Sequence, residues 1–318
     1  MVTAREMAIA RSVIYASLFD YPLTLAQLHH TLIESDQSPS EILAVYDGSA
    51  RLQRIVDHRD GFFFPAGRDD LIAERRRREA RSRRFLHQHD STIRLVCALP
   101  FTRLVALSGS VAHLNLEPDG DLDLFIVTRG RRVRTVTVAV LVLTKLLRRR
   151  RVVCANFIVA DSHLALEPQD LFTANQVLHL KPFIGGDLLE KFLAANPFVT
   201  RFYPNAPAHG FSAPDAEGRP AKRWTRGFGA LKKVTELVLR PAAPIIEAGC
   251  RRLYAWHLRR RSGSWRSPDQ VRLQSDFLKL HTQSHRRSVM DQFDAAVERA
   301  VERAAYQAAP RAVGGSRR

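Results

Sequence analysis

Residues 109–124 read GSVAHLNLEPDGDLDL; an apolar run ends just before them, and a second begins at their last residue. Side chains two positions apart on a strand project from one face of a sheet, so Asp121 and Asp123 should lie together. Two carboxylates at this spacing suit one or two Mg²⁺ ions, which also bind phosphate oxygens. Gly109 and Ser110 predict a tight turn into a helix whose backbone N–H groups can hold phosphate. The stretch therefore predicts a site for a metal ion and a nucleotide.

The surrounding sequence alternates between apolar strand patterns and helical periodicity, which predicts an α/β (α+β) core with a mixed sheet. Strands are expected at residues 103–107, 121–128 and 152–160, and helices at 109–116, 131–147, 168–180 and 187–195.

The Gly-Ser pair, the spacing of about ten residues and the Asp-apolar-Asp triplet resemble the signature of the DNA polymerase beta-type nucleotidyltransferase superfamily. The resemblance spans about 60 residues and implies Mg²⁺- or Mn²⁺-dependent transfer of a nucleoside monophosphate from an NTP, such as ATP, to an acceptor hydroxyl. It implies that Gly109 and Ser110 bind the β- and γ-phosphates. Asp121 and Asp123 are the implied metal ligands and catalytic residues.

The chain departs from this family pattern at two places. Relatives often carry Arg-Gly three residues after the serine, where this chain has His113 and Leu114. Active members usually carry a third carboxylate on the next strand, where Asn156 stands here, and an amide cannot accept a proton near neutral pH. Asp161 is the nearest acid along that strand. Either Asp161 serves, or two carboxylates suffice, or the site binds nucleotide without turnover.

With 318 residues, the chain is long enough for two or three domains. Its three cysteines are scattered, which predicts a reducing compartment and no disulfide framework. The start shows no secretory signal, and polar residues interrupt the longest apolar run, residues 136–147. A membrane span needs roughly 20 apolar residues, so we expect a cytoplasmic protein without a transmembrane segment.

The first 67 residues carry the pattern of a winged-helix-like domain. Residues 4–19 have helical periodicity, and Thr24 and Ser38 each begin a capping box. Residues 52–56 and 62–64 are expected to form two strands joined by a hairpin turn at residues 58–61. The third helix would enter a DNA groove in such a fold, but it has two acids and no Lys or Arg, so specific DNA binding is disfavoured. Packing on the rest of the chain or on a protein partner is preferred.

The net charge of +17 would attract any phosphate-bearing partner. The cations are mostly arginines in helical segments, where a solvated face is the simpler interpretation. A long connecting helix is expected over residues 68–100, with Glu79 and Arg83 at ion-pair spacing.

The complete predicted layout has six parts. They are a winged-helix-like domain (1–67), a connecting helix (68–100), the nucleotidyltransferase core (101–203), a linker (204–223), a helical C-terminal domain (224–306) and a disordered tail (307–318).

In the C-terminal domain, Trp224, Phe228, Leu231, Val234 and Val238 recur at helical spacing and are expected to form a buried stripe. A second interpretation places the residues around Ile245 and Leu253, flanked by arginines, on an anionic membrane surface as a weak contact. Helices are expected near residues 277–293, covering the side of the cleft where the acceptor would dock.

The leading hypothesis is therefore an enzyme that acts on an NTP and on a small-molecule or protein acceptor. The alternatives are a regulator or scaffold that binds nucleotide with weak or no turnover, and a winged-helix DNA-binding regulator.

Overall fold

The computed structural model of the protein describes residues 3–210, 225–260, 271–273, 276–280 and 286–306. The chain forms two compact units, which are residues 1–76, 200–206 and 285–318, and residues 77–199 and 207–284. Among the described residues, no helix combines the length and apolar character needed to cross a bilayer. The predicted tail at residues 307–318 and most of the predicted linker, residues 211–223, lie outside the described residues.

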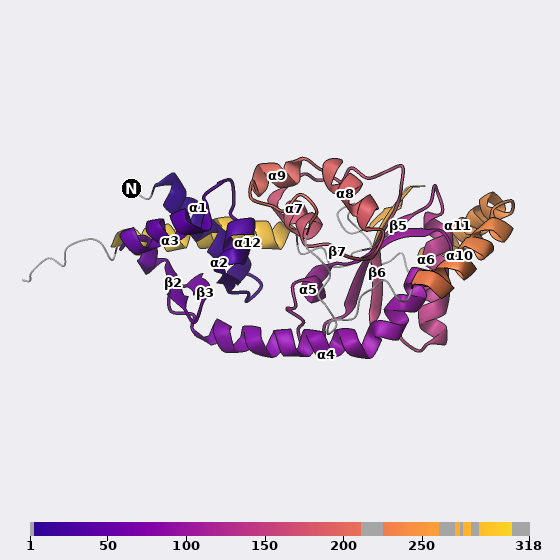
Figure 1. Ribbon diagram of the computed structural model, residues 1–318, viewed down its shortest axis with the longest axis horizontal. Coiled ribbons are helices and arrows are strands. Elements are labelled where there is room, and N and C mark those ends of the chain that lie inside the picture. Colours follow the sequence, from indigo (N-terminus) through magenta and orange to yellow (C-terminus); the bar gives the residue numbers. More distant parts are fainter. Residues whose placement is uncertain (1–2, 211–224, 261–270, 274–275, 281–285, 307–318) are drawn as a thin grey trace, which may run out of the picture. The chain divides into compact units, whose positions relative to one another are not determined.

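The first unit combines helices with a small antiparallel sheet of strand order β1-β3-β2 (Figure 1). Its elements are α1 (Ala4–Ser17), β1 (Leu23–Thr24), α2 (Leu25–His30), α3 (Pro39–Gly48), the 3-10 helix η1 (Leu52–Arg54), β2 (Val56–Arg59), β3 (Phe62–Pro65) and α12 (Arg286–Tyr306). Its core is apolar, and Ile9, Leu28 and Phe63 are fully buried.

Two helix starts in this unit follow from their capping residues. The Thr24 backbone N–H donates to Gln27 Oε1 at 3.0 Å, and Gln27 N–H donates to Thr24 Oγ1 at 3.3 Å. Ser38 and Glu41 form the same reciprocal pair at the start of α3, at 2.9 and 3.3 Å. These hydrogen bonds confirm both predicted capping boxes. Each box satisfies backbone N–H donors at a helix start that have no partner within the helix.

The hairpin lies further along the chain than its pattern predicts. β2 begins at the last residue of the expected first strand, and residues 52–54 form a 3-10 turn instead. The turn consists of Asp60 and Gly61, whose φ angles are 52° and 77°. Asp-Gly is favoured in two-residue hairpin turns because both positions need positive φ. The predicted four-residue turn was therefore too long.

The second unit is built on a six-stranded mixed sheet of order β7-β4-β5-β6-β9-β8. The strands are β4 (Thr102–Leu107), β5 (Leu122–Thr128), β6 (Val153–Ala160), β7 (Lys181–Ile184), β8 (Val271–Leu273) and β9 (Phe277–Leu280). β5 and β6 pair in parallel, and the other pairs are antiparallel. The expected α+β class with a mixed sheet is confirmed.

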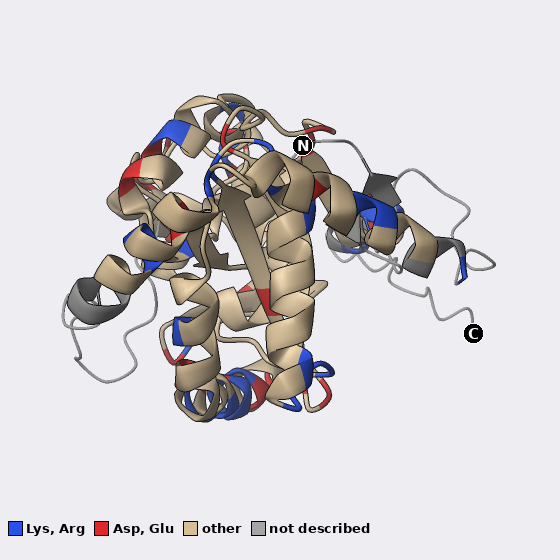
Figure 2. Ribbon diagram, turned by 90° about the vertical axis from the view of Figure 1, so that its right-hand side faces the viewer, with Lys and Arg blue, Asp and Glu red and all other residues tan. Residues whose placement is uncertain are grey.

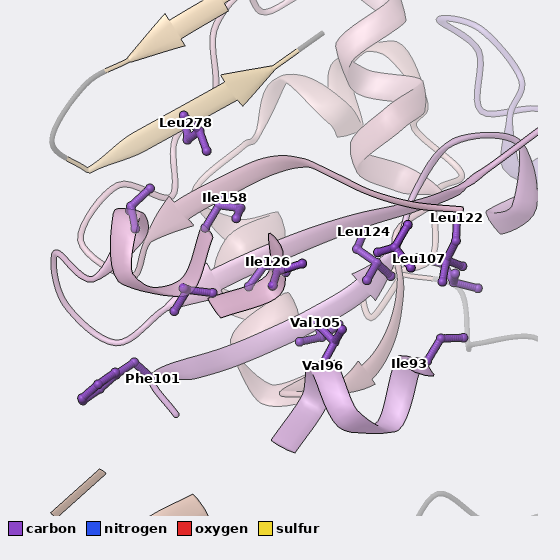
Figure 3. Packing of buried hydrophobic residues seen from close by; sticks show 14 of the residues in the cluster. Ile93, Val96, Phe101, Val105, Leu107, Leu122, Leu124, Ile126, Ile158 and Leu278 are labelled. Atoms are coloured by element: carbon purple, nitrogen blue, oxygen red, sulfur yellow. The ribbon is translucent and has the colours of Figure 1, made fainter. Parts of the chain in front are cut away.

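Helices surround this sheet, and side chains from both kinds of element form its core. The helices are residues 77–98 of α4 (Asp70–Ala98), α5 (Gly109–Ala112), α6 (Val133–Leu146), α7 (Leu171–Leu178), α8 (Gly186–Ala194), α10 (Thr225–Leu239) and α11 (Ala243–Arg259), while α9 (Phe198–Phe202) runs from this unit into the first. In Figure 3, Val96 of α4 lies beside Val105 of β4. The cluster continues through Ile126 of β5 to Ile158 of β6 on one side, and to Leu124 of β5 on the other.

The structure corrects the sequence prediction at three strands. β7 was missed because it is short and contains Pro182, a residue that strands tolerate at the edge of a sheet. β8 and β9 occupy part of the segment expected to be a helical C-terminal domain, and β9 begins where helices near residues 277–293 were expected. Phe277 and Leu278 are both buried, so they lack the alternation that identifies a strand.

The final helix, α12, belongs to the first unit. Phe293 is 2% exposed, and its ring meets Tyr15 of α1 edge-on at a centroid distance of 5.3 Å. Residues 224–306 are therefore divided between the units and do not form one helical domain.

The expected buried stripe on α10 is exposed. The exposed fractions of Leu231, Val234 and Val238 are 62%, 58% and 70%. Trp224 and the side chain of Phe228 lie outside the described residues. Periodicity identifies an apolar helix face, but it does not show whether another element covers that face.

α4 matches the expected connecting helix closely. The exposed Arg83 pairs with the half-buried Glu79 at 2.7 Å. Figure 2, in which α4 lies at the bottom nearly end-on, shows blue and red residues mixed along it. Arg75 differs from the predicted solvated face, since it is 6% exposed. Its guanidinium donates to the Pro22 carbonyl at 2.5 Å and lies over the Tyr21 ring at 3.9 Å.

Candidate metal centre

The turn between β4 and α5 lies directly against the start of β5. Leu107 and Leu124 are partners in the antiparallel pair, and the next backbone contact is a hydrogen bond from Ser108 N–H to the Asp123 carbonyl at 3.0 Å. Gly109 has a φ of +62°, which a residue with a Cβ rarely adopts. A Cβ added there would overlap Asp123 Oδ2 and lie 3.1 Å from Asp123 Cγ. The turn therefore needs glycine both for its backbone and for the room it leaves to the carboxylate.

The two aspartates lie on the same side of β5. Asp121 immediately precedes the strand, and Leu122, between the two acids, is fully buried. The parallel neighbour β6 places Cys154 in register with Asp123. Ligand atoms of Asp121, Asp123 and Cys154 lie within 4.8 Å of one another, and all three residues are half-buried. The structure thus brings together two carboxylates and one thiol beside Gly109.

Cys154 was missed as a member of this cluster. The sequence shows no metal-ligand spacing between Cys154 and any histidine or other cysteine, because its partners come from another strand. The signal that could have identified it is parallel pairing of β5 with β6, which sets the first residues of β6 beside the acids. Carboxylates suit hard ions such as Mg²⁺ and Mn²⁺, whereas a thiolate favours softer ions, so the donor set is a mixed one.

Asp161 is not part of this cluster. It follows the far end of β6, where its backbone N–H donates to the Thr128 carbonyl at the far end of β5. Its carboxylate pairs with Arg103 at 2.8 Å and accepts from Gly130 N–H at 2.8 Å. Because β5 and β6 run in parallel, a residue that follows β6 lies a full strand length from Asp123. The side chain of Asn156, the other suggested third position, lies outside the described residues.

Ser110 lies in the first turn of the short helix α5. Its carbonyl accepts from the N–H groups of His113 and Asn115 at 3.1 and 2.9 Å, which closes the helix into a compact loop. The His113 ring packs on the His179 ring at a centroid distance of 3.9 Å. Burial lowers the pKa of His179 to about 4, and its Nδ1 lies 2.8 Å from the Asn175 carbonyl oxygen. His179 is therefore uncharged near neutral pH and supports the loop by packing.

A scan against protein-family models finds no match for this chain. Searches of curated proteins and of solved structures find no match either. The functional argument therefore depends on the motif and on the geometry of these residues.

Proposed function

We propose that this protein is a metal-dependent nucleotidyltransferase that moves a nucleoside monophosphate from an NTP to an acceptor hydroxyl on a small molecule or a protein. The observation that carries the proposal is the cluster of Asp121 and Asp123 beside Gly109, at a turn that has no room for a side chain. The spacing resembles that of the DNA polymerase beta-type superfamily, and the strand–helix–strand order of β4, α5 and β5 supports it. We extend the proposal to the architecture, with a nucleotidyltransferase core in the second unit.

The residues present fit a divalent cation. Two half-buried carboxylates whose oxygens lie within 4.8 Å of each other can share one Mg²⁺ or Mn²⁺ ion. When bound, such an ion would neutralise charge on the phosphate oxygens and lower the pKa of an acceptor hydroxyl. Asp121 and Asp123 would hold the ion and thereby orient the phosphates. The backbone of Gly109 and Ser110 would receive the β- and γ-phosphates, because the absent side chain permits a close approach.

A second candidate is a regulator that binds nucleotide without turnover. It is favoured by the place of Asp161, whose carboxylate is engaged by Arg103 at the far end of the strands. On β6, the residue in register with Asp123 is Cys154, so a thiol and not a third carboxylate lies opposite this acid. A thiol carries no negative charge unless it loses its proton, so Cys154 is not equivalent to the carboxylate that the family pattern has on this strand.

DNA binding through the first unit is the least favoured candidate. The order of its helices and hairpin is that of a winged-helix-like domain, and we propose that assignment. The helix that would enter a groove is α3, which carries Glu41 and Asp47 and no Lys or Arg. Glu41 is used in the helix cap. Groove-binding helices need cations for phosphates, so we assign this unit a packing role.

The test is incubation of the protein with α-labelled NTPs and Mg²⁺ or Mn²⁺, with pyrophosphate release and label transfer to the protein or to added acceptors as readouts. We expect Asp121→Asn and Asp123→Asn to reduce metal-dependent nucleotide binding at least about a hundredfold, since each removes charge beside the ion. Asp119→Asn is the matched control, because Asp119 is an exposed acid in the same loop. Equal binding by all three variants and the wild type would refute the metal role.

Cys154→Asp separates the two candidates. If the third carboxylate is what the site lacks, this variant should bind Mg²⁺ about tenfold more tightly, because affinity rises with the number of charged ligands. It should also release pyrophosphate where the wild type does not. Wild-type turnover that Cys154→Asp leaves unchanged would favour the enzyme with two carboxylates. A wild type and variant that both bind nucleotide and both fail to react would favour the regulator.

A further inference from the structure

Most of the large exposed apolar side chains described in the second unit lie on two consecutive helices, α10 and α11; Val142, Leu146 and Leu147, on α6 and just after it, are the others. α10 contributes Leu231, Val234, Leu237 and Val238, and α11 contributes Ile245, Leu253 and Trp256. Their exposed fractions run from 51% for Trp256 to 76% for Ile245. We call these seven residues the apolar face of the α10–α11 segment. A soluble surface rarely carries so many together unless it meets a partner or a membrane.

The exposed charged side chains that the structure describes on α10, α11 and their ends are all positive. Lys233, Arg240, Arg251, Arg252 and Arg260 are exposed on the same two helices and their ends. The cation Arg260 also lies over the Trp256 ring, at 3.8 Å from its centroid.

The two acids of the α10–α11 segment are bonded to other parts of the unit. Between residues 225 and 260 the acids in the sequence are Glu236 and Glu247. Glu236 accepts from Phe101 N–H at 2.7 Å and pairs with Arg129 at 3.2 Å. Glu247 accepts from Thr135 N–H at 2.8 Å, at the start of α6. Both carboxylates are thus used for packing within the unit, which leaves the outer face with a net positive charge.

A cavity of about 440 Å³ lies beside the apolar face. Arg129, Arg132, Lys233 and Arg240 line it, and Glu236 is the acid among its lining residues. Leu237 of the apolar face also lines this cavity. Cations outnumber the single acid among its lining residues, so this open hollow favours a phosphate-bearing group.

We propose that the α10–α11 segment docks on a bilayer that contains anionic phospholipids. The apolar face would enter the boundary between headgroups and acyl chains, and the cations would contact lipid phosphates. The alternation of aliphatic and cationic side chains favours this partner over a nucleic acid. Single strands bind through cations and aromatic platforms, and exposed aliphatic side chains would gain little from a sugar–phosphate backbone.

The proposal predicts two separable contributions to membrane affinity. Each aliphatic side chain that moves from water into the boundary should contribute roughly tenfold to affinity. Each cation near an anionic surface should contribute about fivefold, and this part should weaken with salt.

The experiment is cosedimentation of the full chain with vesicles of phosphatidylcholine, with or without one third of phosphatidylglycerol. We expect binding to the anionic vesicles only, with a blue shift of Trp256 fluorescence that Trp256→Phe removes. The double variant Leu237→Ser with Ile245→Ser should bind about a hundredfold more weakly. The matched control is Leu237→Ile with Ile245→Val, which keeps both positions apolar and should bind like the wild type.

The charge variant is Lys233→Gln with Arg240→Gln, and its control is Arg299→Gln with Arg303→Gln, which removes two exposed cations of α12. The first should lose about twentyfold and the second much less. Equal losses in both would overturn the proposal, as would equal binding to neutral vesicles. Self-association that the serine variant abolishes, without vesicle binding by the wild type, would assign the apolar face to a second copy of the chain. These outcomes do not depend on whether the metal centre is active.

Discussion

Gly109→Ala tests the central geometry of the metal centre. The new methyl group would occupy the space of Asp123 Oδ2, and it would lie 3.2 Å from Asp123 Cβ, so a small side-chain rotation does not relieve the contact fully. Alanine at a φ of +62° also costs about 1–2 kcal/mol of backbone strain. We expect the free energy of unfolding to fall by about 2 kcal/mol, and the melting temperature of this unit by about 4–8 °C.

The larger effect should be on metal binding. If the Asp123 carboxylate is forced to rotate, it no longer lies beside the Asp121 carboxylate where both can bind one ion. The affinity for Mn²⁺ should therefore fall about tenfold or more. Titration with Mn²⁺, followed by calorimetry or by the electron paramagnetic resonance signal of the free ion, measures this affinity directly. Thermal unfolding with and without Mn²⁺ reports the same loss as a smaller stabilisation by the ion.

Gly130→Ala is the matched control. Gly130 has a φ of +57° in the same unit, and an added Cβ would meet no atom within 4 Å. It should show the same strain, about 1–2 kcal/mol, without a change in Mn²⁺ affinity. If Gly109→Ala binds Mn²⁺ like the wild type, or if both glycine variants lose affinity equally, then the Asp123 carboxylate is not positioned at Gly109 as a ligand.

Two further predictions concern the stability of the second unit. Burial lowers the pKa of His179 to about 4 from 6.5, so between these pH values the unfolded chain binds a proton that the folded protein excludes. The free energy of unfolding, measured with urea, should therefore fall by up to about 3 kcal/mol as the pH decreases from 6.5 toward 4. His179→Gln should flatten this pH dependence. If His179→Gln keeps the same dependence of stability on pH, other titrating groups cause that dependence. Glu247 accepts from the N–H groups of Arg134 and Thr135 at the start of α6, so Glu247→Ala should cost about 1–2 kcal/mol in thermal unfolding and Glu247→Gln about half as much. Equal stability of all three proteins would show that this capping contact contributes nothing.

Local signals in the sequence predicted the central strands well. The apolar runs on either side of residues 109–124 became β4 and β5, and Thr24 and Ser38 began helices as their capping partners indicated. These features depend on residues a few positions apart, where backbone geometry decides the outcome.

Features that depend on distant pairing were not predictable in the same way. Cys154 joins the acids through the register of β5 with β6, and the same parallel direction removes Asp161 from them. The stripe that includes Leu231 was recognised as apolar, but its exposure depends on which elements pack on α10. Sequence periodicity contains no information on that choice.

The first unit contains segments from both ends of the chain, so it cannot be completed until the last helix has been synthesised. Tyr15 of α1 is covered by Phe293 of α12, and these rings are separated by most of the chain. A ribosome must therefore translate nearly the whole message before α1 gains this neighbour. Until then, the nascent N-terminal segment presents an incomplete apolar surface to chaperones and proteases. A truncated product that ends before residue 286 would lack α12, and with it the Phe293 ring that packs against Tyr15.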